Sequence, residues 1–194
     1  MARPTLLILT LLLAACVPQS AANAPSVTHL GERPALAGKQ PAAVLPADAG
    51  LPVLPPASCP VTREPDTLFV PPAPYSRYPY PGEFWYGSPA LWTALPGNGA
   101  WSALPHDESG YSQKLFWWRD GYDWQAEPKP ALTVTTLRLD AQVATQPQTD
   151  ATNGWNADTQ SFMLIGGDFP TAGCWQVTGR YGNDELSYVV WIAP

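Results

Sequence analysis

One stretch near the end of the chain decides the fold: Cys174-Trp-Gln-Val-Thr-Gly-Arg-Tyr181, then Gly182-Asn183-Asp184, then Leu186-Ser-Tyr-Val-Val-Trp-Ile192. Apolar and polar residues alternate on both sides of a Gly-Asn-Asp turn signal. Successive side chains of a strand point to opposite faces, so this alternation is typical of a strand with one buried face. The stretch therefore predicts a β-hairpin.

Shorter stretches of the same character precede this hairpin. The turn signal Pro96-Gly97-Asn98-Gly99 predicts a hairpin, and Asp120-Gly121 predicts a tight reversal with a return over residues 122–124. No segment has a sustained helical period with caps. We therefore expect an all-β fold, a single β-sandwich or a related small barrel. Besides the last hairpin, the predicted strands cover residues 91–95, 101–104, 114–119, 132–139 and 162–165.

The last hairpin also resembles the closing strands of bacterial immunoglobulin-like domains, over residues 170–193. A glycine enters an alternating strand there, and the return strand carries valines and an aromatic residue to the C-terminus. This resemblance implies an Ig-like β-sandwich. Across residues 84–192, motifs such as Lys114-Leu-Phe-Trp-Trp-Arg119 and Gly121-Tyr-Asp-Trp124 resemble uncharacterised bacterial exported proteins, which implies no activity.

The first residues have the pattern of an export signal. A basic Arg3 precedes an apolar run that ends at Leu13-Ala-Ala-Cys16. The run is shorter than the roughly 20 residues that a membrane-spanning helix needs. It resembles bacterial lipoprotein precursors, which implies a signal peptide over residues 1–15 and an acylated Cys16 that holds the protein on a membrane of the cell envelope. The alternative is an ordinary signal peptide that is cut near Ala22.

Composition divides the rest of the chain into two parts. Residues 17–58 contain no Phe, Tyr or Trp and many Pro and Ala, so we expect a tether over residues 16–57 that cannot build a core. Every aromatic residue lies after residue 68, which predicts one folded domain over residues 58–194. After Cys59 there are seven Lys or Arg against fourteen Asp or Glu. This acidic balance excludes the basic footprint of a nucleic-acid-binding protein.

Two cysteines fall in the predicted domain. If Cys16 is acylated, Cys59 and Cys174 form an even pair in an exported protein, which favours a disulfide. The alternative is a catalytic thiol, because Thr171-Ala-Gly-Cys174 resembles the nucleophile strand of L,D-transpeptidases. Those enzymes carry a His-Gly element shortly upstream, whereas the nearest upstream histidine here is His106, and an activated thiolate needs such a partner. His106 itself lies in a polar stretch that we interpret as a loop.

Aromatic residues are the candidate functional surface. Because neighbours on a strand face opposite ways, one ring of Trp117-Trp118 and one of Phe84-Trp85-Tyr86 must point away from the core. Such a ring could stack on a glycan or a partner protein. The alternative, which we favour, is that a Pro/Tyr arm over residues 71–81 covers these rings within the chain. The candidate ligand-binding residues are Trp85, Tyr86, Trp117, Trp118, Arg119, Asp120, Tyr122 and Trp124.

These observations predict a lipid-anchored envelope protein with a non-catalytic binding or structural β-sandwich. The first alternative is a carbohydrate- or peptidoglycan-binding module that uses exposed Trp and Tyr, and the second is a cysteine-dependent envelope enzyme. No complete catalytic motif or metal-ligand pattern is present, so we expect no cofactor and no metal. The expected partners are the membrane, through the anchor, and a glycan or an envelope protein.

Overall fold

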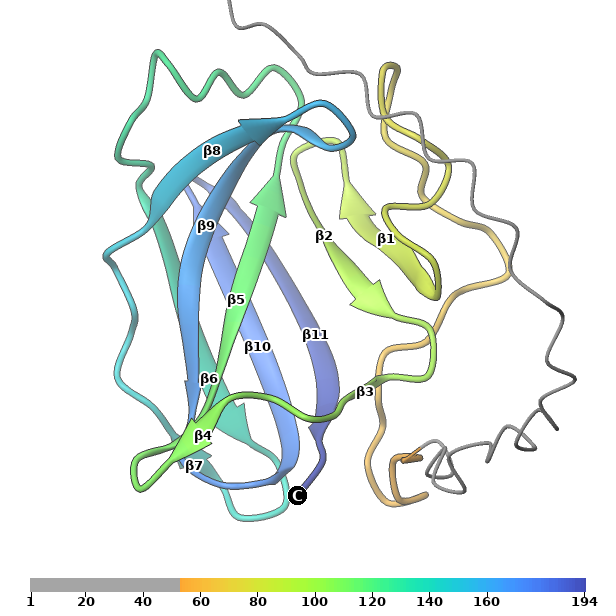
Figure 1. Ribbon diagram of the computed structural model, residues 1–194, viewed down its shortest axis with the longest axis vertical. Coiled ribbons are helices and arrows are strands. Elements are labelled where there is room, and N and C mark those ends of the chain that lie inside the picture. Colours follow the sequence, from red (N-terminus) through yellow and green to blue (C-terminus); the bar gives the residue numbers. More distant parts are fainter. Residues whose placement is uncertain (1–52) are drawn as a thin grey trace, which may run out of the picture. The chain divides into compact units, whose positions relative to one another are not determined.

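The computed structural model describes residues 53–194, which fold into two packed β-sheets, as predicted for a β-sandwich (Figure 1). No helix occurs among these residues. The predicted signal peptide, Cys16 and most of the predicted tether lie outside the described residues. The strands are β1 (Glu83–Ser88), β2 (Leu91–Pro96), β3 (Ala100–Trp101), β4 (His106–Asp107), β5 (Gly110–Trp118), β6 (Leu132–Arg138), β7 (Val143–Ala144), β8 (Thr152–Asn156), β9 (Gln160–Phe169), β10 (Gly173–Tyr181) and β11 (Asp184–Ile192).

The first sheet has the strand order β1-β2-β5-β9-β8, with β4 paired to the start of β5. The second sheet has the order β3-β11-β10-β6-β7. All pairs are antiparallel except β3 with β11. The predicted C-terminal hairpin is confirmed as β10 and β11, and the strand predicted over residues 132–139 is confirmed as β6.

Alternation places the large apolar side chains between the sheets. From the first sheet come residues such as Phe84, Leu115 and Trp117, and from the second come Trp175 and Val190, all of them buried. Burial of apolar area of this kind is the main favourable term in folding, at about 25 cal/mol per Å². The sixteen buried residues of this cluster come mainly from the strands of both sheets and form the main core of the described part of the chain.

A second apolar cluster lies on the outer face of the first sheet. Trp85, Trp92 and Trp118 are fully buried there, although they point away from the inter-sheet core. Tyr75 of the Pro/Tyr arm packs edge-on against the rings of Trp85 and Trp92, with centroid distances of 6.0 and 5.5 Å. Phe69, just before the arm, lies 5.6 Å from Trp92. The segment before β1 therefore covers the outer face of the sheet.

The predicted disulfide is confirmed. Cys59 and Cys174 are bonded, with Cα atoms 5.6 Å apart and a sequence separation of 115 residues. They form a small cluster with Val61 on the outer face of the second sheet. Nearby, Thr62 exchanges two hydrogen bonds with Val189 of β11. The start of the described chain is thus fastened to the second sheet both covalently and by hydrogen bonds.

The hairpin predicted around Pro96-Gly97-Asn98-Gly99 is wrong. The turn forms, with Gly99 N donating to Pro96 O, but the chain does not return alongside β2. Instead β3 pairs with β11 in the other sheet. A turn signal defines a reversal of direction, whereas the strand that accepts the returning chain is selected by tertiary packing.

Two other predictions need correction. Asp120-Gly121 forms a turn, but residues 122–124 make no return strand, and the chain instead loops to β6. The short strand predicted over residues 162–165 is the middle of β9, which continues through Gly166 and Gly167 to Phe169. Gly167 is tolerated because its missing side chain leaves room for Leu115, whose Cδ1 would lie 2.7 Å from a Cβ at that position.

Gly179 gives a stability test of the core. A Cβ at this position would lie 2.7 Å from Cζ2 of Trp117 and nearer still to the next two ring carbons. Trp117 is fully buried and its ring is rigid, so it cannot move aside. We expect Gly179→Ala to lower the free energy of unfolding by about 3 kcal/mol, measured by urea denaturation. Gly166→Ala is the matched control, because nothing lies within 4 Å of its Cβ position, and equal losses in both variants would contradict the clash.

Candidate functional site

The structure buries the rings that the sequence singled out as a binding platform. Trp117 lies in the inter-sheet core, while Trp85 and Trp118 lie in the outer cluster. Each is at most 1% exposed. Trp85 also donates its indole N–H to the carbonyl of Ser76 in the arm, at 2.9 Å. These three rings face the way that strand alternation requires, but none of them reaches the surface.

The remaining candidates lie near the surface, and two of them contact residues outside the candidate set. The guanidinium of Arg119 lies 5.1 Å from the ring centroid of Tyr181. Tyr122 donates its hydroxyl to the carbonyl of Glu127 at 3.1 Å. Asp120 is exposed, Tyr86 is half-buried against the core, and Trp124 is 37% exposed. Tyr86 and Trp85 line one cavity, whereas Trp118 lines another.

A set of residues that shares Trp118 with the predicted platform forms a groove, and the cause is the corner between β2 and β3. β2 pairs with β5 at only two positions, Trp92 with Trp118 and Thr93 with Trp117. Beyond Thr93 the chain leaves β5 to cross to the other sheet, as the diverging arrows of β2 and β5 show (Figure 1). Residues 112–116 of β5 therefore have no strand partner on the side of β2.

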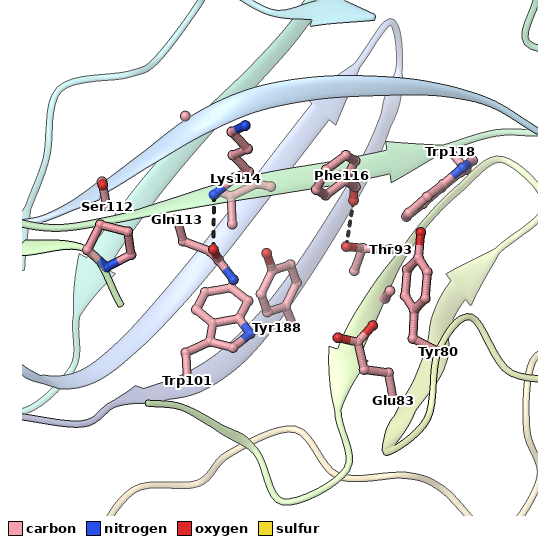
Figure 2. A pocket seen from close by; sticks show the side chains of 14 residues that line it. Tyr80, Glu83, Thr93, Trp101, Ser112, Gln113, Lys114, Phe116, Trp118 and Tyr188 are labelled. Carbon is pink, nitrogen blue, oxygen red and sulfur yellow. Dashed lines mark hydrogen bonds between the residues drawn. The ribbon is translucent and has the colours of Figure 1, made fainter. Parts of the chain in front are cut away.

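This fork opens a groove of about 490 Å³. Its walls come from β2, β5 and the end of the Pro/Tyr arm, and its floor comes from β3 and β11 (Figure 2). A volume of this size is typical of small-molecule sites, which span roughly 300–1,000 Å³. The lining includes the aromatic side chains of Tyr80, Trp101, Phe116, Trp118 and Tyr188 and the polar side chains of Glu83, Thr93, Ser112, Gln113 and Lys114.

The backbone edge of β5 is partly closed by side chains. Thr93 donates its hydroxyl to the carbonyl of Phe116 at 2.8 Å, at the vertex of the fork. The side-chain oxygen of Gln113 accepts from the amide of Lys114 at 3.1 Å, and both bonds are drawn in Figure 2. Two backbone groups that a neighbouring strand would otherwise pair are thus already satisfied.

Tyr188 is the most informative residue of the groove. It is 2% exposed, yet it lines the groove with its hydroxyl directed toward β5 (Figure 2). The ring is held between Trp101 and Trp117, at centroid distances of 6.3 and 5.7 Å. No residue in the described part of the chain forms a hydrogen bond with this hydroxyl. Burial raises the pKa of Tyr188, so the hydroxyl remains protonated and can donate.

Two charged groups lie on the walls of the groove. Glu83 is half-buried on β1, and burial raises the pKa of its carboxyl. Lys114 is exposed on β5. Within residues 53–194 neither side chain takes part in an ion pair. The groove therefore combines apolar rings with hydrogen-bonding groups of both kinds, which suits an uncharged polar ligand.

Sequence reasoning missed this groove for a physical reason. Alternation places Tyr188 on the inner face of β11, where a core residue is the ordinary interpretation. Trp101 was assigned to a hairpin that does not form. Both residues line a cavity only because β2 leaves β5 early, and this depends on which sheet receives β3.

The candidate catalytic residues are not arranged as a nucleophile and a base. The sulfur of Cys174 is bonded to Cys59, so it carries no thiolate in this form. His106 is exposed and lies against the ring of Tyr111, at a centroid distance of 5.4 Å. Asp107 accepts its hydrogen bonds from Ser109 rather than from His106. Among residues 53–194 no group of three His, Cys, Asp or Glu side chains is placed to hold a metal ion.

The described chain also lacks any helix with the length and hydrophobicity needed to cross a membrane. Comparisons with protein-family models, with curated proteins and with solved structures found no match to this chain.

Proposed function

We propose that this protein is an exported, lipid-anchored component of the bacterial cell envelope whose β-sandwich acts by binding rather than by catalysis. The observation that carries the proposal is the Cys59–Cys174 disulfide. Disulfides persist in oxidising compartments outside the cytosol. The leader that ends at Leu13-Ala-Ala-Cys16 supports the same location and adds a site for acylation.

The strand order supports kinship with immunoglobulin-like domains. In such domains one sheet holds strands A, B, E and D, and the other holds G, F and C, with C′ added in the variable type. The orders β2-β5-β9-β8 and β11-β10-β6-β7 follow the same sequence of strands. β2 takes the place of strand A, and β3, which follows it in the chain, pairs with β11 of the opposite sheet. Immunoglobulin-like sandwiches frequently serve as binding modules, which is an argument by analogy.

Substitution of Cys16 tests the anchor. We expect the full chain, expressed in a bacterial host, to fractionate with membranes, and Cys16→Ser to be recovered in the soluble exported fraction. Two or more acyl chains hold a protein stably on a bilayer. Without acylation, the remaining chain is acidic and is not attracted to anionic lipid headgroups. Intact-mass measurement should find a mature chain that begins at an acylated Cys16.

Two results would contradict this proposal. One is equal membrane retention of Cys16→Ser and the unchanged chain. The other is a mature N-terminus close to Ala22, which would indicate an ordinary signal peptide. Ser20→Ala is a suitable control, because it changes the same region without touching the acylation site.

A further inference from the structure

We propose that the groove between β2 and β5 is a saccharide-binding site. The inference rests on the proposed binding function and specifies where the ligand binds and what its chemistry is. It follows from three features of the groove: a tyrosine hydroxyl with no partner in the described chain, aromatic walls that are open to solvent, and a strand edge that is partly capped.

The hydroxyl of Tyr188 is the first feature. The buried side-chain polar atoms that lack a partner among the described residues are Nε1 of Trp92 and Nε1 of Trp117, and the Tyr188 oxygen is not one of them. This hydroxyl faces a groove, so a ligand can supply its partner. A sugar hydroxyl can both donate and accept, which matches a phenol that can do the same.

The aromatic walls are the second feature. Tyr80 is 45% exposed, and Trp101 and Phe116 are partly buried. Trp101 is fixed from behind by Phe169, at a centroid distance of 6.0 Å. A rigid ring with one open face offers apolar area to the C–H face of a sugar at little cost in entropy. The polar groups of Glu83 and Lys114 at the rim can then orient the sugar hydroxyls.

The capped strand edge argues against the other class of ligand that fits such a fork. An extended peptide adds to a sheet by pairing with free backbone groups. Here the carbonyl of Phe116 and the amide of Lys114 are already bonded to Thr93 and Gln113. The amide of Ser112 is bonded to the carbonyl of Pro105. A strand would have to break these bonds, whereas a saccharide uses side chains that are free.

Titration calorimetry on the full mature chain tests the inference. The probes are chitotetraose, maltotetraose and soluble peptidoglycan glycan strands freed of their peptides, with the stem peptide alone as a separate arm. We expect at least one saccharide to bind and Tyr188→Phe to weaken this binding about three- to tenfold, the effect of one neutral hydrogen bond. In the NMR spectrum, the indole N–H signal of Trp101 should shift as the saccharide is added.

Tyr181→Phe is the matched control. Its hydroxyl bonds to Glu127 outside the groove, so saccharide affinity should not change, although stability should fall. Tyr188→Phe should leave stability unchanged, because it removes a hydroxyl that bonds to no described residue and faces the groove. This contrast separates a loss of binding from a loss of folding.

Three outcomes would overturn the inference. If no saccharide of the panel binds at millimolar concentration, the groove is not a saccharide site. If a saccharide binds but Tyr188→Phe has no effect and the Trp101 signal does not move, the ligand binds elsewhere and the proposed binding function stands. If the stem peptide alone binds and shifts the Trp101 signal, the groove accepts a peptide strand. Failure of the anchor would be seen separately, in the fractionation of Cys16→Ser.

Discussion

Cys59→Ala together with Cys174→Ala should lower the free energy of unfolding by about 5 kcal/mol, the largest effect expected for this domain. The two cysteines are 115 residues apart, so the bond restricts most of the domain in the unfolded state. The cost in chain entropy of closing a loop grows with the logarithm of its length. Total stabilities of small domains are commonly about 5–15 kcal/mol, so the variant should be close to unfolding at physiological temperature.

Urea denaturation followed by tryptophan fluorescence measures this effect. The slope with urea should also rise, because an uncrosslinked unfolded chain exposes more surface. Reduction of the unchanged protein should reproduce the loss. The control is Cys16→Ser, which leaves the bond intact and should unfold as the unchanged chain does. A loss below about 1 kcal/mol would mean that the hydrogen bonds between Thr62 and Val189 hold this end of the chain without the disulfide.

The parts of the fold that could be predicted from the sequence are those set by local pattern. The hairpin of β10 and β11 has regular alternation on both sides of one turn, and its register follows from the need to bury one face. The disulfide could be predicted because two cysteines fall in the domain and the leader indicates export to an oxidising compartment. Each of these depends on residues within one segment or on a single pair.

The parts that could not be predicted depend on the choice between two sheets. The turn at Pro96-Gly97-Asn98-Gly99 is compatible with a return along β2 or a crossing to β11, and only packing of Trp101 against Phe169 and Tyr188 distinguishes them. Alternation shows that Trp118 points outward, and the predicted cover of such rings by the Pro/Tyr arm is confirmed; what the sequence could not show is that Tyr75 is the arm residue that packs there. The groove results from the first of these choices, so no local motif marks it.

The Pro/Tyr arm gives the second large effect. Phe69→Ala combined with Tyr75→Ala should lower the free energy of unfolding by about 4 kcal/mol. A fully buried Phe costs about 3–5 kcal/mol when truncated to Ala, and these two half-buried rings should each cost about half of that. Both rings contact Trp92, so their contributions are coupled and the sum is an upper value.

The same variant should open the outer cluster to solvent. Acrylamide quenching of tryptophan fluorescence should increase, because Trp85 and Trp92 lose the rings that cover them. Tyr78→Ala is the matched control within the arm. Tyr78 is 42% exposed and contacts Arg77 and the carboxylate of Glu64 at the surface, so its loss should cost less than about 0.5 kcal/mol and leave quenching unchanged.

Comparison of the Phe69→Ala/Tyr75→Ala double variant with Tyr78→Ala also decides whether the aromatic residues of the outer cluster are structural or form a binding platform. If the double variant is destabilised and more easily quenched, while saccharide affinity at the fork falls less than in Tyr188→Phe, the arm acts as a structural cover and the binding surface is the groove. If the double variant loses no more stability than Tyr78→Ala and instead gains affinity for a saccharide probe, the arm shields a binding platform on Trp85 and Trp118. The two interpretations differ physically. In the first, burial of these rings by the arm stabilises the folded domain. In the second, the arm competes with the ligand for the same rings, so weakening the arm strengthens ligand binding.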